Sequence, residues 1–180
     1  EKFEGLKDKT RQDLKSFIND NLAYRNLCQT PIFLQMFCEL FDSDLNISSK
    51  KFSITLFMDD LIKGRFRNNK LSDKEKMNAI EFLSDLAFYG YQYNGQIIFS
   101  EDDIKKYTPS EEGEKVNIKL LENTQLFVKS SYKHPTEYYF SHLLFQDWFL
   151  ANYIANYLQI PNSYEFQQVY DFIKDNINNL

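Results

Sequence analysis

Apolar side chains recur at helical spacing over most of the chain, which predicts a mainly helical protein. In the first half, this spacing marks helices over residues 7–22, 31–41, 54–67 and 72–93. The apolar faces expected to point inward include Leu22, Ile54 and Met77. The last of these helices opens with the capping-box pair Ser72 and Glu75 and is apolar over more than half of its circumference. We therefore expect it to be buried.

The second half of the chain mixes short helices with short strands. We expect a strand at 96–99, helices at 100–107 and 116–123, a loop at 108–114, and strands at 126–130 and 137–140 joined by a turn at 133–136. A helix followed by a strand, two helices and a two-stranded wing is typical of a winged-helix domain. A long helix over 141–158, with Ser141 as its N-cap, and a final amphipathic helix over 163–179 complete the pattern.

The expected fold class is mainly α, with a helical domain and a winged-helix domain with a small β-wing, followed by the start of a second helical domain. The polar segment 42–51 separates the first helices from the rest, and Pro161 ends the long helix. These features place the domains at 1–47, 48–158 and 159–180. Because the first residue is Glu rather than Met, we expect the chain to be a piece of a longer protein.

Charge and composition narrow the class of partner. The 180 residues contain 21 Lys and Arg against 26 Asp and Glu. Residues 1–70 carry 12 basic and 10 acidic side chains, and residues 71–180 carry 9 and 16.

The longest run without charge, 148–164, contains Asn, Gln and Pro, so we expect no membrane span. Two cysteines without a CxxC motif suit a reducing compartment, which predicts a cytoplasmic location.

A winged helix first suggests DNA binding, but the charges argue against it. Residues 96–141 carry six basic and eight acidic side chains, and the second short helix offers only Lys115 and Lys119 beside Glu122. Duplex binding uses clustered basic side chains to displace counterions from the phosphates. We expect no nucleic-acid partner, although DNA binding remains an alternative.

Other groupings of reactive side chains give no catalytic or metal site. The adjacent pairs Asp59-Asp60 and Asp102-Asp103 lie on predicted helices, where neighbouring side chains point about 100° apart and do not converge. Cys28 and Cys38 have no histidine close in sequence, so we do not expect a reactive thiol. The chain by itself is therefore predicted not to be an enzyme.

His142 is the residue with the strongest chemical interest. It lies at the start of the long helix, where unpaired backbone N–H groups and the positive end of the helix dipole favour an anion. The same positive end disfavours an imidazolium, so a neutral ring is expected to donate a hydrogen bond to a phosphate oxygen. A buried histidine bonded to a backbone carbonyl is the alternative, and the residues alone leave both open.

Residues 140–151 (FSHLLFQDWFLA) are similar to the F-x-H-x-x-F-Q-E-F-x-A-A segment of NACHT NTPases, the STAND-class ATPases that include NOD-like receptors of innate immunity. Asp147, Trp148 and Leu150 depart from that pattern. Other stretches resemble family segments in the same order. They are 27–38 (LCQTPIFLQMFC), the helix from Thr55 to Arg65, 83–90 (LSDLAFYG) and 99–104 (FSEDDI). The resemblance covers residues 10–158.

The resemblance implies a nucleotide-controlled switch. In the family, the residue matching Pro31 packs on the adenine of ADP, and the residue matching His142 contacts its β-phosphate. ADP then holds the winged helix against an upstream P-loop nucleotide-binding domain of the same chain. Replacement by ATP favours an open form that assembles into homo-oligomers, with innate immune or defence signalling as the expected setting. No metal is implied for this part of the protein.

The sequence lacks the P-loop pattern G-x-x-x-x-G-K-[ST] and an acidic strand for magnesium. We therefore expect the nucleotide-binding domain to precede residue 1 and a sensor or effector to follow residue 180. Two other classes of function stay open, a protein-interaction adaptor with an acidic winged helix and the DNA-binding domain considered above.

Overall fold

The computed structural model describes residues 8–20, 22–42, 53–92, 95, 97–107, 118–130 and 136–177. Over these residues the chain forms nine helices and one three-stranded antiparallel sheet, which confirms the mainly helical fold class. The chain divides into two compact units, Glu1–Asn68 (unit 1) and Asn69–Leu180 (unit 2). The domain boundaries expected after residues 47 and 158 stay a prediction.

Unit 1 is helical throughout its described part, with α1 (Asp8–Asp20), α2 (Leu22–Leu27), α3 (Pro31–Asp42) and α4 (Ile54–Asn68). Helix α1 packs on α2 and α3, and α3 packs on α4. The rings of Phe37 and Phe57 stack with their centroids 4.6 Å apart at the centre of the contact between α3 and α4. The other buried apolar side chains of this unit are Leu14, Met36, Leu40, Met58, Leu61, Ile62 and Phe66.

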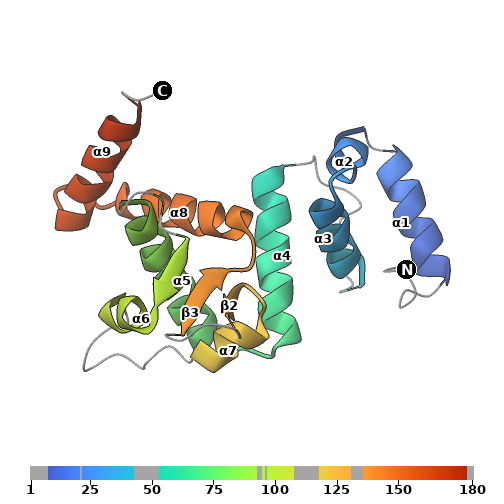
Figure 1. Ribbon diagram of the computed structural model, residues 1–180. Coiled ribbons are helices and arrows are strands. Elements are labelled where there is room, and N and C mark those ends of the chain that lie inside the picture. The colour runs from blue at the N-terminus through green and yellow to red at the C-terminus, as the bar shows by residue number, and fades with distance from the viewer. Residues whose placement is uncertain are drawn as a thin grey trace. The chain divides into compact units, whose positions relative to one another are not determined.

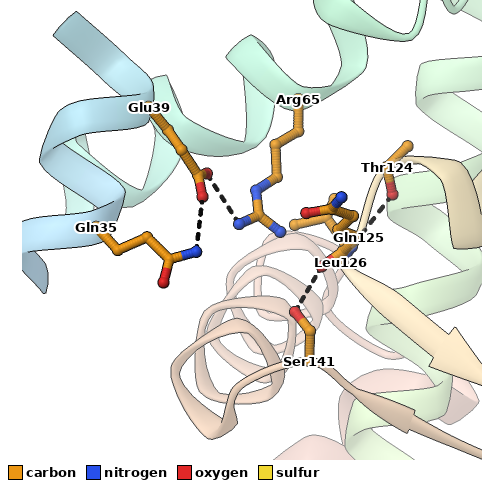
Figure 2. Close-up of polar contacts among 7 residues, drawn as sticks. All are labelled: Gln35, Glu39, Arg65, Thr124, Gln125, Leu126 and Ser141. Carbon is orange, nitrogen blue, oxygen red and sulfur yellow. Dashed lines mark hydrogen bonds and ion pairs between the residues drawn. The ribbon is translucent and has the colours of Figure 1, made fainter. Parts of the chain in front are cut away.

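An ion pair joins α3 to α4 inside unit 1. Arg65 Nη2 donates to Glu39 Oε2 at 2.9 Å, and Gln35 Nε2 donates to Glu39 Oε1 at 3.3 Å (Figure 2). The Arg65 side chain is only 13% exposed, so the pair is shielded from water on the arginine side. Arg65, in the last turn of α4, thus has a specific role in packing α4 on α3.

Unit 2 follows the element order predicted for a winged-helix domain (Figure 1). Its elements are α5 (Asp73–Gln92), β1 (Ile98–Ser100), α6 (Glu101–Tyr107), α7 (Ile118–Asn123), β2 (Phe127–Lys129), β3 (Glu137–Phe140), α8 (Leu143–Tyr157) and α9 (Tyr164–Ile177). The sheet order is β1-β3-β2, so the first short strand joins the predicted two-stranded wing. The loops expected at 42–51 and 108–114 and the turn at 133–136 lie almost wholly outside the described residues.

The sheet buries one face against helices. Phe127 pairs with Phe140, and Phe99 pairs with Tyr138, so these four side chains share a face. All four are buried, and Phe127 is 0% exposed. The outward-facing cross-strand pair, Ile98 and Tyr139, is 43% and 39% exposed.

Helix α8 lies alongside α5 and connects the sheet to α9 (Figure 1). Phe88 of α5 stacks on Tyr153 of α8 with ring centroids 4.2 Å apart, and the two rings form a core with Val169 of α9. Asn152 Nδ2 donates to the buried Ser84 Oγ at 3.0 Å. The burial predicted for α5 is confirmed.

Reciprocal hydrogen bonds between side chains and backbone cap the N-termini of two of these helices. In the predicted capping box, the Ser72 N–H donates to Glu75 Oε2 at 2.8 Å and the Glu75 N–H donates to Ser72 Oγ at 3.3 Å. Ser100 and Asp103 repeat the arrangement at the start of α6. The hydrogen bonds from Ser72 lower the pKa of the Glu75 carboxyl.

Some expected details were wrong. The helix predicted over 7–22 corresponds to α1 over Asp8–Asp20, whereas the helix α2 over Leu22–Leu27 was not predicted. Leu22, Ile54 and Met77 are 61%, 41% and 70% exposed although the spacing places them on apolar faces. Leu22 and Ile54 are the first residues of their helices, and Met77 is the fifth residue of α5. Helical spacing identifies the face of a helix that packs, but not how far along the helix its partner reaches.

Candidate functional site

His142 occupies the N-cap position of α8. Its backbone is extended, with φ −152° and ψ 145°, and Nδ1 accepts a hydrogen bond from the Leu144 N–H at 3.1 Å. The expectation that Ser141 caps this helix was wrong. Ser141 Oγ donates to the Gln125 carbonyl at 2.5 Å, and the Ser141 N–H donates to the Leu126 carbonyl at 3.0 Å.

The cap fixes the role of each imidazole nitrogen. A ring nitrogen that accepts a hydrogen bond carries no proton, so with Nδ1 in the cap the donor of the ring is Nε2–H. The side chain is half-buried and its hydrogen bond goes to a backbone N–H. The alternative of a fully buried histidine bonded to a carbonyl therefore does not apply. Nε2–H is not used by this cap.

The backbone amides of the first turn are less available than the sequence suggested. The Leu144 N–H is occupied by Nδ1 of His142, and the Phe145 N–H donates to the His142 carbonyl at 3.0 Å. An anion at this helix start would consequently depend mainly on the imidazole rather than on free amides.

Hydrogen bonds at the junction of α7 and β2 hold the residue that precedes His142. Thr124 Oγ1 donates to the Leu121 carbonyl at 2.6 Å and accepts from the Leu126 N–H at 3.3 Å. Gln125 then has a positive φ of 57°, and its carbonyl receives the Ser141 hydroxyl (Figure 2). Since Ser141 is fixed in this way, the start of α8 is anchored to the wing.

Most of the other residues in the 140–151 segment have packing roles. Phe140, Phe145, Gln146 and Phe149 are buried. Asp147 is exposed and accepts a hydrogen bond from the Tyr91 hydroxyl of α5. Burial, followed by this hydrogen bond, raises the pKa of Tyr91 to about 12. His142 stays the candidate of this segment for contact with a phosphate, because Asp147 is an acceptor with a negative charge.

Pro31 is the first residue of α3, as predicted, and it is exposed. The Thr30 carbonyl accepts the first helical hydrogen bond from the Leu34 N–H at 3.2 Å. Pro31 belongs to unit 1 and His142 to unit 2. Their joint contact with one ADP is a proposal.

The cysteines and the acidic pair Asp102-Asp103, which the sequence also offered as reactive groups, have structural roles. Burial, and then the nearby Cys38, raises the pKa of the Cys28 thiol to about 11, so it is a poor nucleophile at neutral pH. Asp103 caps α6, whereas Asp102 pairs with Lys105 at 3.2 Å, so these neighbours diverge. Within the described residues, no group of three His, Cys, Asp or Glu side chains could hold a metal ion.

Sequence reasoning missed Asp85. This carboxyl lies in α5 among buried neighbours, and burial, followed by Glu81 and Glu165, raises its pKa to about 7. The available indication was a charged residue between Ser84 and Leu86 on a helix already predicted to be buried.

Comparisons with known proteins give no match to a family model and none to a curated protein. The family resemblance of the sequence motifs therefore stays a prediction. In the part of the chain that the structure describes, no helix is long and apolar enough to cross a membrane.

The cap can be tested on the chain itself. His142→Ala should lower the free energy of unfolding of unit 2 by about 1 kcal/mol, because the Leu144 N–H loses its acceptor. His142→Asn should cost less than about 0.5 kcal/mol, because asparagine is a good N-cap. Urea unfolding followed by tryptophan fluorescence measures both. Equal losses for the two variants would show that His142 does not cap α8.

Proposed function

We propose that this chain is the regulatory, non-catalytic part of a NACHT-type STAND signalling ATPase. In the resting state it closes over ADP that is bound to an upstream P-loop domain, with His142 on the β-phosphate and Pro31 on the adenine. On activation it releases and allows homo-oligomerisation. The observation that carries the proposal is the N-cap geometry of His142, which uses Nδ1 as an acceptor and leaves Nε2–H as the donor of the ring at the start of α8.

The energy of such a contact suits a switch. A hydrogen bond to a charged group contributes about 1.5–3 kcal/mol, which corresponds to a factor of about 10–150 in an equilibrium constant. A ligand shifts a conformational equilibrium only by its difference in affinity for the two states. Loss of the histidine contact when ATP replaces ADP would supply part of that difference.

One observation favours a second candidate, a protein-interaction adaptor. The outward face of the sheet exposes Ile98 and Tyr139 as a cross-strand pair, and residues 71–180 carry seven more acidic than basic side chains. An exposed pair of large side chains in a part of the chain with an excess of acidic residues suits a protein partner better than a phosphate backbone.

The test uses a longer protein that includes the residues encoded before Glu1. We expect ADP to copurify with it as a monomer and ATP to produce larger assemblies, with mass measured by light scattering after size exclusion. Residues 1–180 alone should retain no nucleotide, because they lack the P-loop. An upstream sequence without a P-loop, or a longer protein that binds no nucleotide, would contradict the proposal and favour the adaptor.

A further inference from the structure

Asp85 lies at the packed interface of α5 with α8. The preceding residue, Ser84, accepts a hydrogen bond from Asn152 of α8, and Phe88, one turn later, stacks on Tyr153 of α8. Helix α9 closes the same cluster with Val169 and Phe172, whose ring centroid is 5.4 Å from that of Phe88. The carboxyl is therefore placed where three helices meet.

The groups that face this carboxyl are acidic or neutral. Glu81 lies one turn earlier on α5, and Glu165 lies in the first turn of α9, four residues before the buried Val169. Tyr89 lies one turn later on α5, and Tyr153 and Tyr157 face the carboxyl from α8. Burial raises the pKa of the Tyr153 and Tyr157 hydroxyls, so both stay uncharged. An ionised Asp85 would thus be desolvated and close to two other carboxylates, one of them on α9.

We propose that the charge of Asp85 controls how firmly α9 is held against α5 and α8, so that a neutral carboxyl keeps α9 docked and an ionised one weakens its packing. Undocking of α9 moves Glu165 away and admits water, and both changes favour the ionised form. This inference concerns the packing of unit 2 and does not depend on the nucleotide switch.

The direction with pH follows from linkage. The pKa of Asp85 is about 7 when α9 is docked and falls toward the ordinary value of 3.8 when undocking opens the site to water and removes Glu165. Between these values the docked form keeps a proton that the open form has lost, so docking weakens as pH rises from about 4 to about 7 and then levels off above about pH 8, where both forms are ionised. The open fraction of α9 should rise about tenfold between about pH 6 and about pH 8.

Amide hydrogen exchange of the central turn of α9, corrected for intrinsic exchange rates, measures that fraction in the 180-residue chain. We expect protection to fall about tenfold between about pH 6 and about pH 8 in the wild type. Asp85→Asn should abolish the fall, because the amide cannot ionise. The matched control is Asp171→Asn on the exposed face of α9, where the retained Oδ1 still accepts from Gln167. This control should behave like the wild type.

Two results would overturn the inference. One is a pH-independent protection of α9 in the wild type, or the same fall in Asp85→Asn. The other comes from a direct titration of the carboxyl by NMR. We expect the ¹³C resonance of the Asp85 carboxyl to titrate with a midpoint near 7. A midpoint near 4, the ordinary range for Asp, would remove the basis of the proposal even if α9 responded to pH.

Discussion

Replacement of Phe127 by alanine is expected to lower the free energy of unfolding of unit 2 by about 3–5 kcal/mol. Phe127 is 0% exposed, and its ring stacks on Tyr138 with centroids 5.7 Å apart. The other rings around it belong to Phe82, Phe99 and Phe140. These neighbours come from the other two strands of the sheet and from α5, so the cavity cannot close without disturbing the whole sheet. The loss is a large share of the 5–15 kcal/mol typical of a domain.

Trp148 makes this measurement specific to unit 2. It is the only tryptophan of the chain and lies on α8, so its fluorescence during urea unfolding follows this unit. The matched control is Tyr139→Ala, which removes an aromatic ring from the opposite, exposed face of the same sheet and should cost less than about 1 kcal/mol. If the two variants unfolded at the same urea concentration, Phe127 would not be the centre of this core.

The helices and strands of unit 2 could be predicted because their determinants are local. The pairs Ser72 with Glu75 and Ser100 with Asp103 specify two helix starts within four residues each, and the capping bonds form as their spacing indicates. Helix α2 was missed because its six residues are too few for a helical period to stand out. The exposure of Met77 depends on where neighbouring elements end, which spacing does not record.

The candidate site shows the same division between local and distant determinants. The position of His142 at the start of a helix follows from the end of the strand at Phe140 and the apolar pattern after it. The identity of the N-cap residue does not follow from this local pattern. Ser141 is by itself the better capping residue, but the Gln125 carbonyl, 16 residues earlier, takes its hydroxyl. The burial of Asp85 likewise depends on α8 and α9, which follow much later in the chain.

The central claim concerns what His142 does beyond capping. Asparagine at this position keeps an oxygen acceptor for the Leu144 N–H, but its shorter side chain withdraws the donor that the imidazole presents on Nε2. His142→Asn therefore separates the cap from the proposed phosphate contact, because we expect it to retain the fold while it removes the donor for that contact. Leu143→Ala, a change at the neighbouring 52% exposed side chain, is the matched control.

The most direct measurement is the rate at which ADP leaves the longer protein that contains the upstream residues. We expect His142→Asn to release ADP about tenfold faster or more, as the loss of a hydrogen bond to a charged phosphate implies, while Leu143→Ala behaves like the wild type. If His142→Asn retained ADP as long as the wild type did, His142 would be a helix cap alone and the switch would have no contact through this residue.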